Sequence, residues 1–301
     1  MVNILITGGA GFIGSSLANK LLLNKRYRIV VVDNLETGLL SNLKIKKENF
    51  YKIDVNNFKP LSKVFAKYKF DYVFHFAALV GVQRTQNSPL KVLKDIRGFE
   101  NIFNLSSDYK IKTIFYSSSS EVYGEPVTIP QNEETTPLNS RIPYAIVKNL
   151  GESFCKTFYK EKNLKYTIFR FFNTYGKKQS DDFVISRFVN LAKKNKLIKI
   201  YGDGKQKRTF CYIDDTIDTI IQCFEKNLHI NDILNIGSDK EITLNFLAKL
   251  IIKTLNSKSK IKHIDPLKEG DMKRRRPDNK KMLKILNRKL INISQGLKKI
   301  I

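Results

Sequence analysis

The chain has 301 residues, with 54 Lys plus Arg against 28 Asp plus Glu, a formal net charge of +26 and only 3 Cys. Because 42% of the residues are hydrophobic, a core can form without disulfide or metal staples. These values exclude collagen, coiled-coil and disulfide-scaffold proteins and argue against intrinsic disorder. They indicate a globular protein of one large or two modest domains, and no metal site is expected.

The positive charge raises the question of a polyanionic partner. Most of the basic residues are Lys scattered along the chain, and the one dense cluster is Lys273-Arg274-Arg275-Arg276. Nucleic-acid footprints concentrate charge on one face or in one run. We therefore attribute most of the charge to compositional bias and expect no nucleic-acid partner.

The N-terminal residues begin directly with an apolar run at 2–6, without a basic segment, a long apolar region or a small-residue cleavage site. The most apolar stretch, 73–82, contains His75 and has about half the length of a membrane helix. The three Cys form no CxxC pair. We expect a cytoplasmic protein without a membrane partner.

Short apolar runs alternate with helical periodicity through the first two thirds of the chain, which is typical of parallel strands covered by helices on both faces. Strands are predicted at 3–7, 29–33, 50–53, 72–76, 113–117 and 166–171, and helices at 12–24, 59–67, 91–106 and 143–161. This repeated βαβ order predicts an α/β fold with a doubly wound parallel sheet.

The regular alternation ends near Asn173, after which loops such as 201–205 contain Gly, Asp and Lys. We expect one domain over residues 1–172 and a smaller, discontinuous domain over residues 173–301. An apolar helix at 213–225 indicates that residues 210–236 return to the first domain.

The first predicted strand leads into a glycine-rich loop that opens a helix and contains Gly8, Gly11 and Gly14. These glycines would permit a tight turn, close approach of a pyrophosphate and close helix–strand packing, with the helix N-terminus facing the phosphates. Asp33 ends the next strand, where a carboxylate accepts hydrogen bonds from an adenosine ribose and repels a 2′-phosphate. The pattern predicts a site for NAD.

Tyr144 and Lys148 are spaced i, i+4, so both side chains lie on one face of a helix that Pro143 could open. Ser119 follows the fifth strand, at the edge of the sheet where open α/β folds bind ligands. A Lys ammonium and a nicotinamide cation would lower the Tyr pKa, and a Ser hydroxyl could hydrogen-bond the same substrate oxygen. The set predicts alcohol oxidation coupled to hydride transfer.

Seven segments resemble the extended short-chain dehydrogenase/reductases of the NAD-dependent nucleotide-sugar epimerase/dehydratase family. They occur in the family's order over essentially the whole chain, at 8–14, 75–78, 118–124, 144–148, 170–176, 202–208 and 274–278. The resemblance implies a Rossmann domain that binds NAD, a C-terminal domain that binds a nucleotide sugar, and chemistry that begins at C4 of the sugar.

The resemblance also implies roles for individual residues. Tyr144 would be the general base, Lys148 its electrostatic partner and ribose ligand, and Ser119 a hydrogen-bonding residue, with Glu121 as a further catalytic residue. The predicted cofactor contacts are Gly8, Gly11, Phe12, Ile13, Gly14, Asp33, Asn34, Asp54, Val55, Ala77, Tyr144 and Lys148. The predicted substrate contacts are Thr85, Ser119, Ser120, Asn173, Arg208 and Arg275. Asp54 could equally be a turn residue, and Thr85 could cap the following turn.

Four outcomes share a 4-keto sugar: its release by a 4-dehydrogenase, 4-epimerisation, 4,6-dehydration and decarboxylation of a uronate. Dehydratases that resemble this chain carry an adjacent Asp-Glu pair, whereas Ser120 precedes Glu121 here, which disfavours dehydration. Ser120, Glu121 and Arg275 are similar to the UDP-glucuronate decarboxylase pattern, although Ser119 replaces its usual Thr and the loop 79–85 looks less similar. We expect an NAD-dependent 4-dehydrogenase or 4-epimerase that supplies sugars for surface polysaccharide, with decarboxylation as the alternative.

Asp95 and Phe99 depart from the Asn and Thr that are usual in the family's NxxGT segment, and the sequence predicts no outcome for them. An RNA-binding family member that has lost catalysis is the non-enzymatic alternative, which intact Ser119, Tyr144 and Lys148 disfavour. Many family members dimerise through the Tyr-xxx-Lys helix, so the resemblance implies a homodimer.

Overall fold

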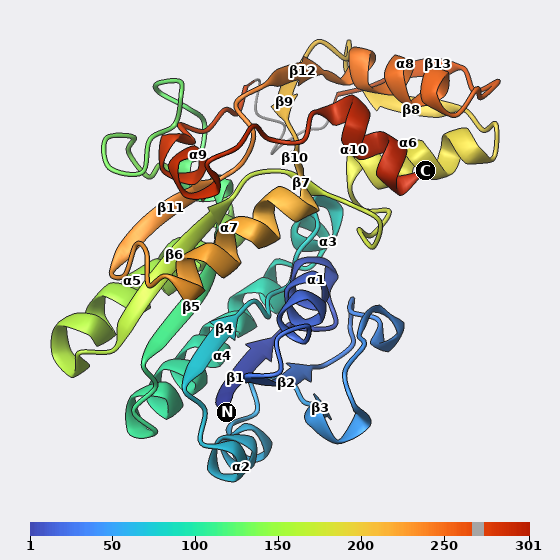
Figure 1. Cartoon of the computed structure of the whole chain (residues 1–301). Helices are drawn as coiled ribbons and strands as arrows, with labels where there is room; N and C mark the ends of the chain where they lie inside the picture. The colour runs from blue at the N-terminus through green and yellow to red at the C-terminus, as the bar shows by residue number, and fades with distance from the viewer. Residues whose placement is uncertain (267–273) are drawn as a thin grey trace.

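A seven-stranded parallel sheet forms the centre of the molecule, in the strand order β11-β6-β5-β4-β1-β2-β3 (Figure 1). The computed structural model describes residues 1–266 and 274–301. The strands are β1 (Val2–Thr7), β2 (Tyr27–Asp33), β3 (Phe50–Lys52), β4 (Tyr72–His75), β5 (Thr113–Ser119), β6 (Lys165–Phe171) and β11 (Asp232–Ile236). The predicted doubly wound α/β fold of the Rossmann type is confirmed, because sequential strands run outward from β1 in both directions.

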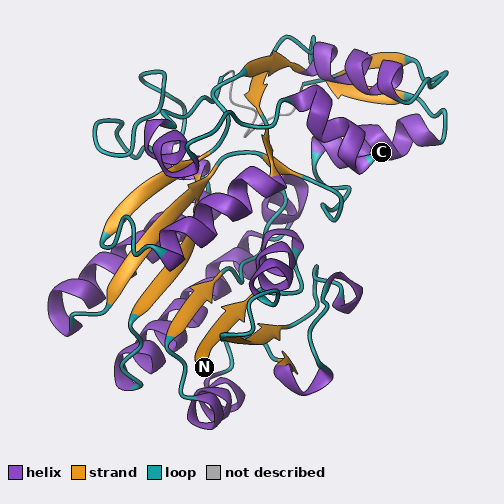
Figure 2. Ribbon diagram, in the orientation of Figure 1, coloured by secondary structure: helices purple, strands orange, loops and turns teal. Residues whose placement is uncertain are grey.

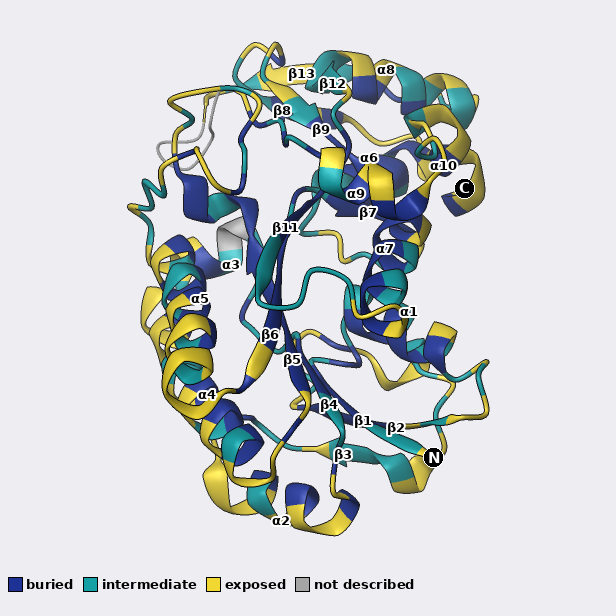
Figure 3. Ribbon diagram, turned by 60° about the vertical axis from the view of Figure 1, so that its left-hand side comes forward, coloured by how far each residue is buried: buried dark blue, intermediate teal, exposed yellow. Residues whose placement is uncertain are grey.

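Helices cover both faces of this sheet. One face carries α1 (Phe12–Leu21) and α7 (Ile213–Glu225), and the other carries α2 (Phe58–Tyr68), α4 (Pro89–Asp108) and α5 (Pro143–Lys162). Alternate strand residues enter the two cores: Ile4 packs with α1 and α7, whereas Leu5 packs with the opposite helices. Figure 3 shows the consequence, since the strands are largely buried while the outer sides of α4 and α5 are exposed.

The remaining elements form a smaller layer beyond the carboxyl ends of the strands (Figure 2). It contains three two-stranded sheets: β7 (Thr174–Tyr175) with β10 (Cys211–Tyr212), β8 (Ile198–Tyr201) with β13 (Ile261–Ile264), and β9 (Lys207–Thr209) with β12 (Glu241–Thr243). Its helices are α6 (Val184–Lys193), α8 (Leu244–Thr254) and α10 (Ile293–Ile300). In the same part of the chain, α7 packs on α1, β11 extends the main sheet beside β6, and α9 (Lys280–Leu286) packs on α7.

One local expectation is wrong. The loop predicted at 79–85 is partly helical, because α3 (Val82–Asn87) begins within it directly after Gly81, whose φ is +108°. Within the described residues, no helix combines the length and the apolar composition that crossing a membrane requires.

A buried ion pair joins α5 to β6. Glu152 and Arg170 are each 1% exposed. Arg170 donates to Glu152 from Nε at 2.9 Å and from Nη2 at 2.7 Å, and the Ser118 hydroxyl on β5 donates to the same carboxylate at 2.5 Å. The Arg170 guanidinium also lies 4.8 Å from the centre of the Tyr123 ring. Because a buried charge is tolerated only with its partners in place, this pair fixes α5 against the ends of β5 and β6.

Hydrogen bonds extend from this cluster to the segment that carries Arg275. Asn235 on β11 donates to the carbonyl oxygens of Gln131 at 2.9 Å and Asp278 at 3.3 Å. The Gln131 N–H donates to the Arg276 carbonyl at 2.8 Å, and the Asp278 N–H donates to the Gln131 carbonyl at 2.7 Å. The backbone that directly follows Arg275 is therefore held against the main sheet.

Arg170→Met should destabilise the protein by about 3–5 kcal/mol, because it leaves the Glu152 carboxylate buried without its bidentate partner. The double variant Arg170→Met/Glu152→Leu should recover much of that loss, since it removes both charges together. Urea unfolding of the wild type and both variants measures the effect. An equal loss in the single and double variants would show that packing, not charge pairing, dominates at this position.

Candidate active site

The glycine-rich loop connects β1 to α1 at the carboxyl edge of the sheet. Gly8 has a φ of +65°, and a Cβ there would lie 2.6 Å from the Ala77 nitrogen. A Cβ on Gly14 would lie 2.3 Å from the Gly8 carbonyl oxygen, so neither position accepts a side chain. Gly11 precedes the helix, whose N-terminus has no side-chain cap. The first N–H groups of α1 can therefore bind an anion, with the helix dipole in support.

Asp33 lies buried at the end of β2 beside this loop. Its Oδ2 accepts the Ala10 N–H at 2.9 Å, and its Oδ1 accepts the Leu35 N–H at 2.8 Å. Each carboxylate oxygen can accept one further hydrogen bond. The N–H groups at the uncapped helix N-terminus can donate to a pyrophosphate, and the fixed carboxylate beside them can accept a ribose hydroxyl. This arrangement fits a dinucleotide with a free ribose hydroxyl.

The other residues predicted to contact the cofactor lie along the same edge. Asn34 is exposed, and its side chain accepts the N–H of Glu36 at 3.0 Å. The Asp54 carboxylate accepts the Asn56 N–H at 2.9 Å. This is the contact of a turn residue, the alternative role that the sequence allows for Asp54. Val55 is buried against Gly98, and the Ala77 N–H lies 3.3 Å from the Thr7 hydroxyl. Their contacts with a cofactor stay predictions.

Tyr144, Lys148 and Ser119 meet at the carboxyl end of β5. Pro143 occupies the first turn of α5, so Tyr144 and Lys148 follow on one face of that helix. The Tyr144 hydroxyl lies near the side chain of Ser119, the last residue of β5. Lys148 is 3% exposed, and its Nζ donates to the Ser117 carbonyl at 2.7 Å and to the Ser117 hydroxyl at 3.3 Å. The three residues chosen from the sequence are thus neighbours in space.

Burial dominates the ionisation of this group. It raises the pKa of Tyr144 above its ordinary value, although the Ser119 hydrogen bond opposes the shift. It lowers the pKa of Lys148 to about 8, with the negative charge of Asp95 opposing. Lys148 directs its N–H bonds to Ser117, and a lowering of the Tyr144 pKa by Lys148 together with a bound nicotinamide stays a prediction.

His75 is a buried member of the site for which the sequence suggested no role. It ends β4, is 1% exposed, and its Nδ1 lies 2.8 Å from the Thr7 hydroxyl. Burial, reinforced by the Lys148 ammonium, lowers its pKa to about 3, so the imidazole is neutral. Its ring lies 5.7 Å from that of Phe99 and 6.1 Å from that of Tyr116. A His that ends an otherwise apolar strand is the sequence signal that could have identified it.

Glu121, Ser120 and Arg275 form a second group next to Ser119. Glu121 lies in the short helix η3 (Ser120–Tyr123), and its Oε1 is 2.8 Å from Arg275 Nη2. The other terminal nitrogen of Arg275 donates to the Ser120 hydroxyl at 3.4 Å. The second oxygen of Glu121 is buried and has no hydrogen-bond partner among the residues that the structure describes. The contact joins residues that are far apart in the sequence.

The remaining predicted substrate residues lie on other elements. The Asn173 amide donates to the Thr209 carbonyl at 3.1 Å, which places Asn173 beside the strand that carries Arg208. Arg208 on β9 donates to the Lys207 carbonyl at 2.8 Å. The Thr85 hydroxyl on α3 donates at 3.0 Å to the carbonyl of Gly81, the residue before that helix. Their roles in substrate binding stay predictions.

The basic cluster is divided among different partners. Arg274 pairs with Glu241 on β12 at 2.6 Å, whereas Arg275 pairs with Glu121. Lys273 lies outside the described residues. Two adjacent arginines of the cluster therefore serve separate contacts and do not form one continuous basic patch.

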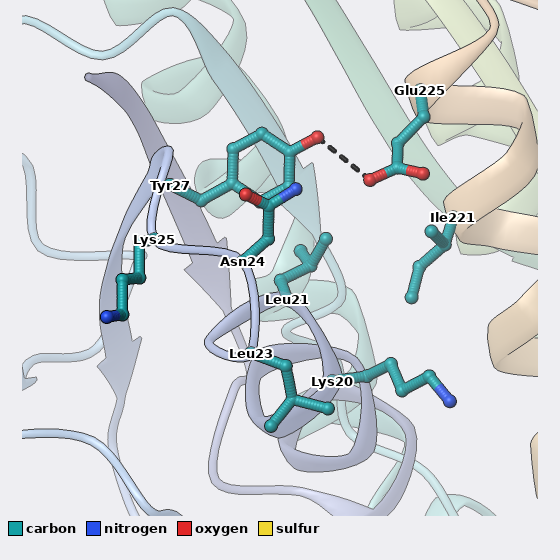
Figure 4. Close-up of a pocket in the computed structure, with 8 residues that line it drawn as sticks. All are labelled: Lys20, Leu21, Leu23, Asn24, Lys25, Tyr27, Ile221 and Glu225. Atoms are coloured by element: carbon teal, nitrogen blue, oxygen red, sulfur yellow. Dashed lines mark hydrogen bonds between the residues drawn. The ribbon is translucent and has the colours of Figure 1, made fainter.

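A pocket of about 480 Å³ lies at the far end of α1 from the glycine-rich loop (Figure 4). It is bordered by Tyr27, whose hydroxyl donates to Glu225 at 2.9 Å, and by the exposed Leu23. None of the predicted site residues lines it. In residues 1–266 and 274–301, no group of three or more His, Cys, Asp or Glu side chains is arranged to hold a metal ion.

Comparison with known proteins agrees with this geometry. Residues 4–237 match the NAD dependent epimerase/dehydratase family. A putative UDP-glucose 4-epimerase from Methanocaldococcus jannaschii is 33% identical over 303 residues, covering 99% of this chain and 97% of that protein. A UDP-N-acetyl-alpha-D-glucosaminuronate decarboxylase from Bacillus cytotoxicus is 34% identical over 319 residues, covering 99% and 96%. The solved structure of UDP-glucose 4-epimerase with UDP-glucose from Thermotoga maritima is similar with a TM-score of 0.92 at 31% identity, covering 99% and 97%.

The sheet order and the glycine-rich loop are those of a Rossmann-type dinucleotide-binding protein. The chain belongs to the NAD-dependent epimerase/dehydratase family, and NAD is the cofactor of that family.

Asp33→Asn should narrow the preference for NAD over NADP by about tenfold or more, because it removes the charge that repels a 2′-phosphate. Asn keeps an oxygen that can accept a backbone N–H, so the loop should stay in place. Binding constants for both dinucleotides, measured by calorimetry, give the ratio. An unchanged ratio would mean that Asp33 only supports the loop through Ala10 and Leu35.

Proposed function

We propose that this protein catalyses NAD-dependent oxidation at C4 of a nucleotide-activated sugar, as a 4-epimerase or a 4-dehydrogenase. The observation that carries the proposal is the convergence of Ser119, Tyr144 and Lys148 at the carboxyl end of β5. In open α/β sheets, ligands bind at this edge. The similarity to a UDP-glucose 4-epimerase over almost the whole chain supports a sugar bound to a nucleoside diphosphate.

The chain's own residues bind the reactants and move the proton. Bound NAD supplies the hydride acceptor. Tyr144 takes the proton from the C4 hydroxyl, and Ser119, which lies near Tyr144, orients the same sugar oxygen. Lys148 contributes a positive charge on the same face of α5, which favours the tyrosinate. The first turn of α1 binds the cofactor pyrophosphate, and Asp33 accepts its ribose hydroxyl.

Cationic and amide side chains of the smaller layer are suited to the substrate diphosphate. Asn173 and Arg208 lie on adjacent elements. A guanidinium binds phosphate oxygens in a bidentate manner, which a Lys cannot reproduce. We therefore assign Asn173 and Arg208 to the diphosphate, and Ser120, Glu121 and Arg275 to the sugar.

Decarboxylation of a nucleotide-linked uronate is the second candidate. The buried Arg275 guanidinium lies beside the Ser120 hydroxyl, and together they could bind a substrate carboxylate. The 34% identity with a UDP-N-acetyl-alpha-D-glucosaminuronate decarboxylase also supports decarboxylation as a candidate. RNA binding is less well supported, because two arginines of the basic cluster are paired with Glu241 and Glu121.

Nucleotide sugars are precursors, so we further propose a cytoplasmic enzyme whose product serves surface polysaccharide synthesis.

A homodimer through α4 and α5 belongs to the same proposal. These two helices pack side by side, and their outer surface exposes the apolar side chains of Leu90, Leu93 and Ile146. Exposed apolar groups at one place favour a protein interface. Leu150 and Phe154 on α5 are partly buried, and Phe154 packs against Phe103 inside the chain.

Tyr144→Phe should lower turnover by about 10²-fold or more, because it removes the general base while keeping the ring. The assay uses purified protein with UDP-, GDP- and dTDP-sugars and follows NADH absorbance and product mass. An unchanged mass with a new isomer shows epimerisation, loss of two hydrogens shows dehydrogenation, and loss of CO₂ shows decarboxylation.

The matched control is Tyr159→Phe on the same helix, because Tyr159 is 38% exposed and distant in sequence from the catalytic turn. It should leave turnover unchanged. Full activity in the Tyr144→Phe variant would refute the proposed chemistry, as would binding of RNA with a steep salt dependence and no reaction with any sugar nucleotide.

Ile146→Asp should convert the dimer to a monomer, because it places a charge in an apolar interface without disturbing the core. Ile146 is 48% exposed within the single chain, so the variant should fold. Leu23→Asp, on the distant surface near the pocket of Figure 4, is the control and should leave the dimer intact. Light scattering after size-exclusion chromatography measures both, and a wild-type monomer would overturn this part of the proposal.

A further inference from the structure

A second pocket, of about 330 Å³, lies at the opposite end of the main sheet from the candidate active site. It is formed by the turns that lead from α4 into β5 and from α5 into β6, so it borders the amino ends of two paired strands. In Figure 1 these strand ends point away from the smaller layer. None of the residues assigned to the cofactor or to the substrate lines this pocket. Its volume is within the range of pockets that hold small ligands.

The lining of this pocket is basic. Four of its nine residues are Lys, and none is Asp or Glu. Lys112 pairs with Asp71 at 2.9 Å, so its charge is balanced. The side chains of Lys110, Lys162 and Lys165 make no ion pair or hydrogen bond with the residues that the structure describes. Three ammonium groups without a counter-charge around one pocket create a positive potential that favours a bound anion.

A buried hydroxyl gives a second, independent indication of a ligand. Ser106 lines the pocket and is 0% exposed, and its Oγ has no hydrogen-bond partner in the described part of the chain. Serines on other helices donate to the carbonyl four residues earlier, as Ser16 does to Phe12 at 2.8 Å and Ser153 does to Asn149 at 3.3 Å. A buried hydroxyl without a partner lowers stability. A bound anion would supply the missing acceptor.

We propose that this pocket binds a phosphate group, either as inorganic phosphate or as the phosphate of a small ester. A phosphate carries about two negative charges and several acceptor oxygens, which suits three ammonium groups and a hydroxyl better than a carboxylate does. Asp108 and Glu161, the acidic residues next to the two turns in the sequence, are exposed and do not line the pocket. The proposed site is separate from the active site and does not depend on the proposed reaction.

Lys110→Asn removes one of the three charges and should preserve the backbone. Lys110 has a left-handed φ of +55° just after α4, and Asn adopts this conformation more readily than Lys. Lys69→Asn is the matched control, because Lys69 has a φ of +46° at the end of α2, carries the same charge and does not line the pocket.

Calorimetric titration with inorganic phosphate measures the effect of both variants. The protein is saturated with NAD, so that phosphate does not occupy the cofactor's own site. Lys110→Asn should weaken phosphate binding by about threefold or more, whereas Lys69→Asn should leave it unchanged. Equal weakening by the two variants would overturn the proposal, because it would show only a general attraction by the +26 charge of the chain. Absence of phosphate binding in the NAD-saturated wild type would overturn it as well.

Ser106→Ala should act in opposite directions on binding and on stability. Without phosphate, the urea midpoint of the variant should equal or exceed that of the wild type, because the lost hydroxyl has no partner. Phosphate binding should weaken by about tenfold, because a hydrogen bond to a charged acceptor is lost. A lower midpoint together with unchanged phosphate affinity would show that the hydroxyl has only a structural role and would overturn the proposal.

Glycerol phosphate distinguishes the two sources of the phosphate group. Binding that is tighter than that of inorganic phosphate, and is weakened by Lys110→Asn and Ser106→Ala, supports a phosphorylated small molecule as the ligand. Equal or weaker binding that responds to the same variants supports free phosphate. Failure of the proposal leaves the proposed reaction untouched, because none of these measurements involves turnover of a sugar nucleotide.

Discussion

The bidentate pair between Glu152 and Arg170 is the contact on which the candidate site depends. Tyr144, Lys148 and Glu152 follow one another at four-residue intervals, so they occupy one face of α5 over three successive turns. Each meets a serine of β5: Tyr144 meets Ser119, Lys148 meets Ser117, and Glu152 meets Ser118. Because the buried pair also fixes α5 to β6, the position of the catalytic turn follows from a structural contact deeper in the protein.

Local patterns in the sequence predict the glycine-rich loop and the helix that carries Tyr144 and Lys148 well. Gly8 and Gly14 are required by backbone contacts that any side chain would block, and the spacing of Tyr144 and Lys148 follows from helical geometry. The pair of Glu152 and Arg170 is different, because nothing near either residue in the sequence indicates its partner. The direction of the Tyr144 pKa is also hidden, since burial depends on elements that are distant along the chain.

The partners of the basic residues are also hidden in the sequence, because they lie on elements that are distant along the chain. A run of arginines at 274–276 looks like one basic patch when it is read as a sequence. In the fold, the hydrogen bonds of Gln131 with Arg276 and Asp278 hold this backbone in an extended course beside the sheet. Arg274 then meets Glu241, while Arg275 turns to Glu121. Adjacent charges thus act on opposite sides of one segment, and composition alone cannot separate them.

The contact between Glu121 and Arg275 bears directly on which sugar is accepted. A uronate would place its carboxylate against a guanidinium that already has an anionic partner at 2.8 Å, so Glu121 would have to move or take up a proton. A neutral hexose requires neither change. The second Glu121 oxygen is a buried acceptor without a partner in the described part of the chain, and a sugar hydroxyl could satisfy it. The same pair is thus the feature of the proposed sugar site on which a neutral sugar and a uronate would differ.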